Sequence, residues 1–364
     1  PEAGLQLMDT CGTPFRRVKP ACPLPGGPAA VRGAGGRSFV SCPRSGACGK
    51  VCFGGQPRLL WRTIVGFVGI IANPASGKDI RRLVAHATVV DNSEKVSIVR
   101  RLLLALHASG IQRVEIMPDP FGIGERALKG LHDRSEVIET ASLIDMSIEH
   151  TSADSLRAAQ YLRDAGAGCI IVLGGDGTSR IVAKGAGPVP LLPLSTGTNN
   201  VVPYFVEGTI AGSAAAYVAL HPSTERQALC RRHKRLLVRV NGETIDEALV
   251  EVALVSSSFV GARAVWETGR LRQVFVTRAQ PFNTGLSAII GVVHPVDPAH
   301  PVGASATIVQ NGRKVRVPIA PGSLVPVGIG EITEMKPGIY HPMDSLRPAM
   351  LALDGEREIT LRGE

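Results

Sequence analysis

The sequence predicts an α/β domain with a mostly parallel sheet, followed by an antiparallel β domain of the sandwich type. Apolar strand segments alternate with helical segments between residues 64 and 220, which is typical of a parallel sheet with helices on both faces. Beyond residue 222, strand segments follow one another through tight Asn-Gly turns, as in antiparallel sheets. A chain of 364 residues is long enough for two domains and an additional segment.

The first domain is predicted to span residues 64–222. Its strands are expected at residues 64–72, 113–117, 142–148, 169–173 and 191–194. Its helices are expected at residues 94–108, 125–132, 152–165 and 208–220, with Ser93 as the first N-cap and a further helix beginning near Thr178.

The β-sandwich domain is predicted to span residues 223–350. Its expected strands lie at residues 236–240, 249–257, 273–277, 304–310 and 315–319, with hairpin turns at Asn241-Gly242 and Asn311-Gly312. The basic run at residues 231–235 has two interpretations, either solvated charge at a domain edge or contact with phosphate or another anionic ligand. Residues 351–364 are predicted to return toward the cleft of the first domain.

Residues 1–63 are expected to be a disordered extension rich in Gly, Pro and Cys. They contain eleven Gly, eight Pro and five of the seven Cys, with no sustained helical or strand periodicity. They also hold nine Lys or Arg against two Asp or Glu, which accounts for most of the net charge of +9. The rest of the chain is nearly neutral, so we do not expect a nucleic-acid partner.

Composition narrows the function classes further. No stretch approaches about 18 uncharged apolar residues, so we expect no membrane span. The two cysteines beyond residue 63 favour a reducing, cytoplasmic location. Self-association into a homo-oligomer stays open.

The most informative motif is a glycine turn directly after the apolar segment 170–173. It consists of Gly174, Gly175, Asp176, Gly177 and Thr178. Glycines remove the side chains that would keep an anion from the backbone N–H groups, and a following helix adds its dipole. Because a carboxylate repels phosphate, Asp176 is predicted to orient an acceptor hydroxyl, to accept its proton or to hold a metal ion.

Two further polar loops follow predicted parallel strands. Open α/β sheets bind ligands at the carboxyl ends of their strands, so these loops are expected to form a nucleotide cleft with the glycine turn. The candidate nucleotide-binding residues in them are Asn73, Ser76, Gly77 and Lys78 in the first loop, and Thr196, Gly197, Thr198, Asn199 and Asn200 in the second. Asp79 after Lys78 excludes the phosphate-binding loop of P-loop NTPases.

The C-terminal sequence Asp354-Gly355-Glu356 also has two interpretations. It is either a surface hairpin turn, or it brings two more carboxylates to the cleft. In the second case Asp354 joins Asp176 as a candidate Mg²⁺ ligand, and Glu356 joins Asp176 as a candidate catalytic residue.

Four motifs together resemble the superfamily of NAD kinases and diacylglycerol or sphingosine-type lipid kinases. They are Asn-Pro-x-Ser-Gly at 73–77, Gly-Gly-Asp-Gly-Thr at 174–178, Ser-Thr-Gly-Thr-Asn-Asn at 195–200 and Asp-Gly-Glu at 354–356. Within the superfamily, residues 68–90 and 192–203 are most similar to the ATP-NAD-kinase-like family associated with acetoin catabolism. The resemblance covers roughly residues 64–364.

The resemblance implies an ATP-dependent kinase that uses Mg²⁺, with Asp176 in the transfer site and the glycine turn around the phosphates. It places Asn199 and Asn200 at a nucleotide-contacting position, and Glu356 at the position of a candidate base. NAD is the leading acceptor, although Val250 stands where NAD kinases have an Asn beside the Glu251 position. A lipid kinase and a non-catalytic nucleotide-binding accessory protein are the alternatives.

Overall fold

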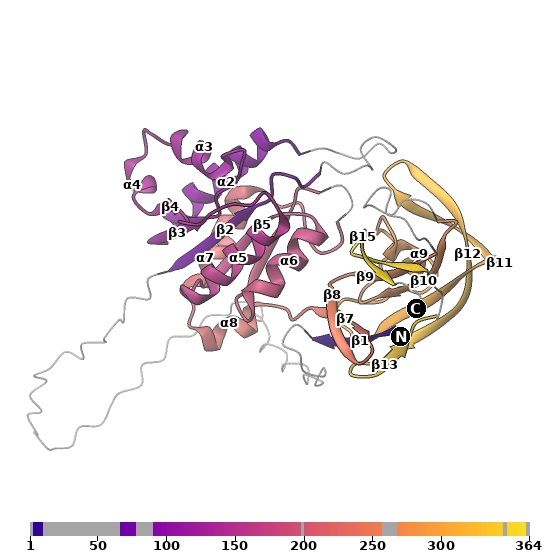
Figure 1. Cartoon of the computed structure of the whole chain (residues 1–364). Helices are drawn as coiled ribbons and strands as arrows, with labels where there is room; N and C mark the ends of the chain where they lie inside the picture. Colours follow the sequence, from indigo (N-terminus) through magenta and orange to yellow (C-terminus); the bar gives the residue numbers. More distant parts are fainter. Residues whose placement is uncertain are drawn as a thin grey trace, which may run out of the picture. The chain divides into compact units, whose positions relative to one another are not determined.

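The computed structural model describes residues 3–9, 66–77, 90–197, 200–256, 268–344 and 348–361. An α/β half contains a five-stranded sheet (Figure 1). Its strands are β2 (Phe67–Ala72), β3 (Arg113–Ile116), β4 (Ala141–Leu143), β5 (Cys169–Gly174) and β6 (Leu191–Ser195). Its helices are α2 (Asn92–Ala108), α3 (Ile123–Lys129), α4 (Ser135–Ile138), α5 (Ser152–Asp164), α6 (Asp176–Ala186), α7 (Gly208–Leu220) and α8 (Ser223–Leu229).

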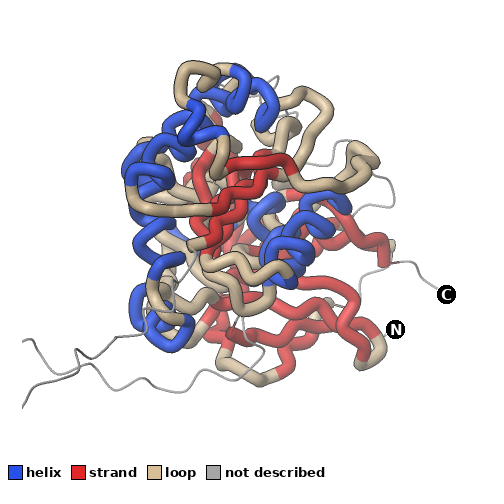
Figure 2. The backbone as a smooth tube through the Cα atoms, turned by 90° about the vertical axis from the view of Figure 1, so that its left-hand side faces the viewer, coloured by secondary structure: helices blue, strands red, loops and turns tan. Residues whose placement is uncertain are grey.

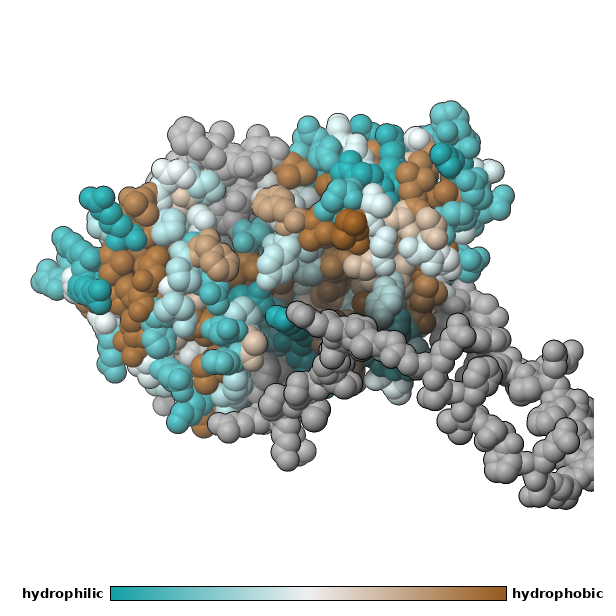
Figure 3. All heavy atoms as spheres, turned by 180° about the vertical axis from the view of Figure 1, so that it is seen from behind, coloured by the Kyte–Doolittle hydropathy of each residue, from teal (hydrophilic) through white to brown (hydrophobic). Residues whose placement is uncertain are grey.

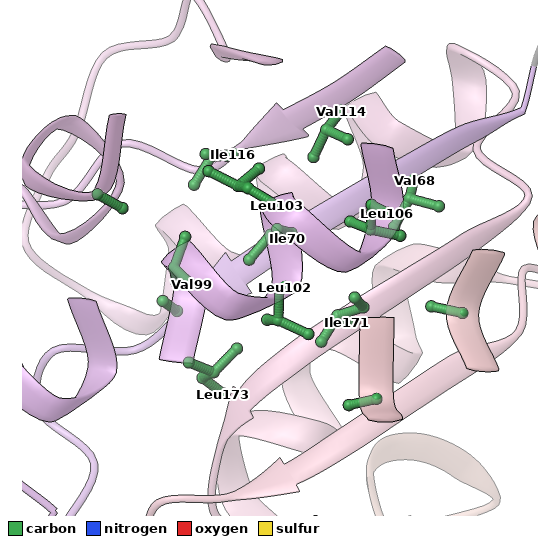
Figure 4. Packing of buried hydrophobic residues seen from close by; sticks show 14 of the residues in the cluster. Val68, Ile70, Val99, Leu102, Leu103, Leu106, Val114, Ile116, Ile171 and Leu173 are labelled. Atoms are coloured by element: carbon green, nitrogen blue, oxygen red, sulfur yellow. The ribbon is translucent and has the colours of Figure 1, made fainter. Parts of the chain in front are cut away.

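The strand order of this sheet is β4-β3-β2-β5-β6, and every pairing is parallel. Helices α2 and α7 pack on one face, where Leu102 and Leu106 meet Ile70 and Ile171 (Figure 4). Helices α5 and α6 pack on the other face, and Figure 2 shows blue helices on both sides of the red strands. Because both faces are covered, β2 and β5 are apolar throughout, and the predicted fold class of this half is confirmed.

The β half consists of two antiparallel sheets, which confirms the predicted fold class. Their orders are β13-β1-β7-β8 and β12-β11-β10-β9-β14-β15, and apolar side chains of both sheets share one core. The short helix α9 (Ser287–Gly291) packs on the outer face of the larger sheet. The strands are β1 (Ala3–Asp9), β7 (Lys234–Val240), β8 (Glu243–Ala248), β9 (Glu251–Val255), β10 (Leu271–Val276), β11 (Gly303–Ala320), β12 (Ser323–Met335), β13 (Tyr340–Pro342), β14 (Ala349–Leu353) and β15 (Glu356–Leu361).

Strand β1 corrects the expectation of disorder at the start of residues 1–63. It lies between β7 and β13, antiparallel to both. Ala3, Leu5 and Leu7 alternate with more polar residues and are buried in the core of the β half. This period-two pattern is too short to stand out beside the Gly- and Pro-rich sequence that follows it. Residues 10–63 lie outside the described part of the chain.

Hairpin predictions have mixed outcomes. Asn241-Gly242 joins β7 to β8 with both residues at positive φ, as predicted. Asn311-Gly312 does not turn the chain, because β11 continues through it with an irregularity in its pairing with β12. The chain reverses instead after β11, at Gly322 with φ +77°.

Two helix starts also differ from the predictions. The N-cap of α2 is Asp91 and not Ser93, since the Asp91 side chain accepts a hydrogen bond from the Glu94 N–H. Helix α6 begins at Asp176, two residues before Thr178. Glycines in its first turn disguise this start, although they do not prevent helical backbone angles.

The two halves meet in a small apolar cluster formed by Val201, Val202, Leu249 and Val250. We call it the junction cluster. On the face shown in Figure 3, hydrophobic patches lie among hydrophilic residues. Among the described residues, no helix combines the length and the hydropathy needed to cross a membrane.

Candidate functional site

The three polar loops of the α/β half meet at the carboxyl ends of β2, β5 and β6. Asn73 Nδ2 donates to Thr178 Oγ1 at 2.8 Å, which joins the first loop to the glycine turn. Ser76 Oγ and Thr196 Oγ1 are hydrogen-bonded at 2.8 Å, which joins the first loop to the third. The Thr196 N–H donates to the Gly174 carbonyl at 3.0 Å. The structure therefore brings together the loops that the sequence proposed as one cleft.

Close approach of these loops depends on glycine at two positions. Gly77 has φ +77°, and a Cβ there would lie 2.8 Å from the Thr196 carbonyl oxygen. A Cβ on Gly175 would lie 3.0 Å from Asn200 Oδ1. Asn200 is held in place because its Nδ2 donates to Ser195 Oγ. Larger residues at Gly77 or Gly175 would push the loops apart.

A buried lysine that the sequence analysis did not identify supports the first loop. Lys95 on α2 is fully buried, and its Nζ donates to the carbonyls of Asn73 and Ser76 at 2.9 and 3.0 Å. It also donates to Asn92 Oδ1 at 3.2 Å. Lys95 thus holds the backbone of the first loop in place through two of its carbonyl groups.

Asp176 is buried at the start of α6. Its carboxylate accepts hydrogen bonds from the N–H groups of Val202 at 2.8 Å and Val201 at 3.0 Å. Burial raises the pKa of Asp176 to about 7, with a further contribution from the charge of Asp354, while the two N–H groups and Arg278 oppose the shift. A carboxyl group with this pKa exchanges a proton near neutral pH.

Asp354 occupies the turn between β14 and β15 in a left-handed conformation with φ +47°. Its carboxylate accepts from the N–H groups of Val250, Leu249 and Glu251 at 2.8, 3.1 and 3.3 Å. Arg180 Nε lies 3.4 Å from Asp354 Oδ2, and both side chains are buried. Asp354-Gly355-Glu356 therefore forms a hairpin turn, and its Asp is buried and not on the surface.

Glu356 begins β15 and approaches the glycine turn. A Cβ on Gly177 would lie 3.9 Å from the carboxyl carbon of Glu356 and from its Oε1. The chain therefore brings the Glu356 carboxylate from the β half to the first turn of α6.

Three predicted site residues, Lys78, Thr198 and Asn199, lie outside the described residues.

Arg180 links the two halves and was also missed by the sequence analysis. It lies on α6 and is only 1% exposed. Besides Asp354, its Nη1 lies 3.4 Å from Asp246 Oδ2 and from the Glu247 carbonyl oxygen on β8. The local sequence shows just that Arg180 lies four residues after Asp176. This spacing does not distinguish a buried arginine from a solvated one.

The comparison with known proteins covers most of the molecule. Over 302 residues, 80% of this chain and 84% of the relative, the sequence is 39% identical to Acetoin catabolism protein X of Cupriavidus necator. The chain belongs to the acetoin catabolism protein X family. Residues 68–221 match the ATP-NAD kinase N-terminal domain, and residues 234–364 match the Acetoin catabolism protein X C-terminal domain. The resemblance stated from the sequence motifs is confirmed.

The ATP-NAD kinase match raises the question of which described carboxylates suit a divalent metal ion. Asp354 does not fit, because its two oxygens already face three N–H groups and Arg180. Among the described residues, no three His, Cys, Asp or Glu side chains are grouped as a metal site. Mg²⁺ commonly takes one or two carboxylates together with substrate phosphates. Asp176 could supply one such ligand, since its carboxylate accepts from just two N–H groups of the described residues.

Proposed function

We propose that the protein is an ATP-dependent kinase that transfers the γ-phosphoryl group to a hydroxyl of a small molecule. The observation that carries this proposal is the position of Asp176, a buried carboxyl with a pKa near 7, beside three loops joined by hydrogen bonds. Phosphoryl transfer depends mainly on positioning and charge stabilisation, so one acid among backbone N–H groups suits it.

In the proposed reaction, N–H groups of the glycine turn and the start of α6 bind phosphate oxygens. The acceptor hydroxyl oxygen attacks the γ-phosphorus, and the bond from that phosphorus to the β–γ bridging oxygen breaks. Asp176 receives the hydroxyl proton, and ADP leaves with the pair of electrons of the broken bond. Bound Mg²⁺ would neutralise phosphate charge, and Glu356 would face the same turn from the β half.

NAD is the proposed acceptor, and a lipid hydroxyl is the alternative within the same chemistry. The name of the Cupriavidus necator relative adds a proposed link to acetoin catabolism. In this structure the Val250 N–H binds Asp354, and its side chain lies in the junction cluster. Val250 therefore offers no amide side chain to an adenosine, and the acceptor has to be established by experiment.

An acceptor panel with γ-³²P-ATP and Mg²⁺ tests the proposal. NAD, diacylglycerol in micelles, a sphingoid base, and acetoin or 2,3-butanediol would be incubated with the wild-type protein and with Asp176→Asn. We expect one labelled product from the wild type and none from the variant. Calorimetric binding of ATP without any product would contradict the kinase proposal and support a nucleotide-binding accessory protein.

A further inference from the structure

Three basic side chains of the β half, those of His233, Lys234 and Arg278, lie close enough to interact electrostatically. His233 and Lys234 stand at the start of β7, and Arg278 follows β10. Arg278 Nη1 donates to the Val201 carbonyl at 3.3 Å, while the Val201 N–H donates to Asp176. Through Val201, Arg278 therefore lies one residue away from the carboxylate proposed to receive the proton.

Lys234 is buried, and its ammonium group can donate one more hydrogen bond than it makes to the described residues. It is 1% exposed, and its Nζ donates to the carbonyls of Asp297 at 2.9 Å and Val302 at 2.7 Å. Neither Lys234 nor Arg278 forms an ion pair with any described carboxylate. Buried lysine and arginine are rarely left without a counter-ion in folded proteins.

Two nitrogen atoms of these side chains also lack a hydrogen-bond partner. Arg278 Nε and His233 Nε2 are buried without a hydrogen-bond partner among the described residues. His233 Nδ1 binds the Lys234 carbonyl, so Nε2 carries the lone pair of the neutral ring. An anion at this position would let the ring take up a proton and donate from both nitrogens.

The electrostatics agree with this geometry. Burial lowers the pKa of His233 to about 3 and that of Lys234 to about 7, and the charge of Arg278 lowers both further. Burial also lowers the pKa of Arg278 itself. Asp297 opposes the shift of Lys234, and Asp297, Asp176 and Tyr204 oppose that of Arg278, but burial has the larger effect on both pKa values. None of these carboxylates forms an ion pair with Lys234 or Arg278 among the described residues.

We propose that His233, Lys234 and Arg278 bind an anionic group of the acceptor, a phosphate or a carboxylate, on the β-sandwich side of Asp176. The assignment to the acceptor rests on the proposed kinase function. The loops expected to hold the ATP phosphates all come from the α/β half, whereas this cluster comes entirely from the β half. The basic run at residues 231–235 thus has solvated charge at Arg231 and Arg232, and an anion site at its buried end.

Pyrophosphate is a suitable probe, titrated by calorimetry into the full chain saturated with the ATP analogue AMP-PNP. We expect wild type to bind it, Arg278→Met to lose at least about tenfold in affinity, and the matched exposed variant Arg316→Met to keep it. Circular dichroism would check folding, and Arg278→Lys should recover part of the affinity. In NMR spectra assigned with His233→Asn, pyrophosphate should raise the pKa of His233.

Equal pyrophosphate affinity in wild type and Arg278→Met would overturn the anion site. If AMP-PNP itself displaces pyrophosphate and Arg278→Met weakens AMP-PNP binding, the anion belongs to the nucleotide and the assignment to the acceptor is wrong. Failure of the kinase proposal would look different. In that case the wild type would phosphorylate neither glycerol 3-phosphate nor glycerol, nor any acceptor of the panel, while Arg278 would still control pyrophosphate binding.

Discussion

Two buried aspartates stand on opposite sides of the junction cluster, and their surroundings differ. Asp176 accepts from the N–H groups of Val201 and Val202, and Asp354 accepts from those of Leu249 and Val250, while the side chains of these four residues pack together. Asp354 has in addition the Glu251 N–H and the cation of Arg180. Asp176 has no ion-pair partner among the described residues.

We propose that this difference separates a structural carboxylate from a reacting one. Burial raises the pKa of Asp354 as well, but Arg180 and three N–H groups oppose that shift, and these contacts fix the β14–β15 turn and tie it to α6. Asp176 has two N–H donors and forms no ion pair with a described residue, and burial raises its pKa to about 7 although Arg278 opposes the shift. A buried carboxyl with a pKa near neutral is typical of groups that exchange protons in a reaction.

The largest expected effect is on turnover in Asp176→Asn. Removing a proton acceptor from the transfer site should lower phosphoryl transfer by about 10²- to 10⁴-fold. The circular dichroism spectrum should stay that of wild type, because an amide oxygen can still accept from Val202. Turnover equal to wild type on any acceptor would show that Asp176 is not the reacting carboxyl.

Asp354→Ala should mainly change stability. Removing this carboxylate leaves three N–H groups without their acceptor and takes one of two carboxylates from the buried Arg180, which should lower the free energy of unfolding by about 3–5 kcal/mol. Urea unfolding measures this loss, and Asp164→Ala, which removes an exposed ion pair with Arg163, serves as the control. A stable Asp354→Ala protein with lost turnover would reverse the roles given to the two aspartates.

The pH dependence of stability sharpens the same comparison. The folded protein keeps the Asp176 proton up to about pH 7, whereas an unfolded chain loses it near about pH 4. Folding therefore takes up a proton in this window, and wild type loses stability as the pH rises through it. Asp176→Asn cannot ionise, so between pH 4 and 7 its unfolding free energy should gain about 4 kcal/mol on wild type, about 1.4 kcal/mol for each unit by which the folded and unfolded pKa values differ. Parallel pH profiles in urea would contradict the raised pKa.

The smallest effect is expected from the support beneath the first loop. Lys95→Met removes the donor to the Asn73 and Ser76 carbonyls and should loosen the loop. ATP affinity should fall by about tenfold, equivalent to about 1.4 kcal/mol. Lys129→Met, which removes an exposed lysine of α3, is the control for this calorimetric measurement. An unchanged affinity would mean that the loop keeps its shape without Lys95.

Sequence reasoning predicted the features that are written in local patterns. Buried strands followed by glycine loops identified β2, β5 and β6 together with the residues that meet at their ends. It could not predict the partners that these residues find from distant segments. Nothing near Arg180 shows that Asp354 will be its partner, and nothing near Lys95 shows that loop carbonyls will surround it. Asn311-Gly312 failed as a turn for the related reason that pairing with β12 overrides local turn chemistry.

The central claim is that N–H groups beside Asp176 bind a polyphosphate, and AMP-PNP titration by calorimetry tests it most directly. Gly177→Ala would place a methyl group at an ordinary 3.9 Å from Glu356, so the fold should tolerate it while the anion meets the new side chain. Gly269→Ala, with no heavy atom within 4 Å of its Cβ, is the matched control. We predict that wild type and Gly269→Ala bind AMP-PNP alike and that Gly177→Ala binds it at least about tenfold more weakly. Identical affinities in all three proteins, or no binding by wild type, would contradict the claim.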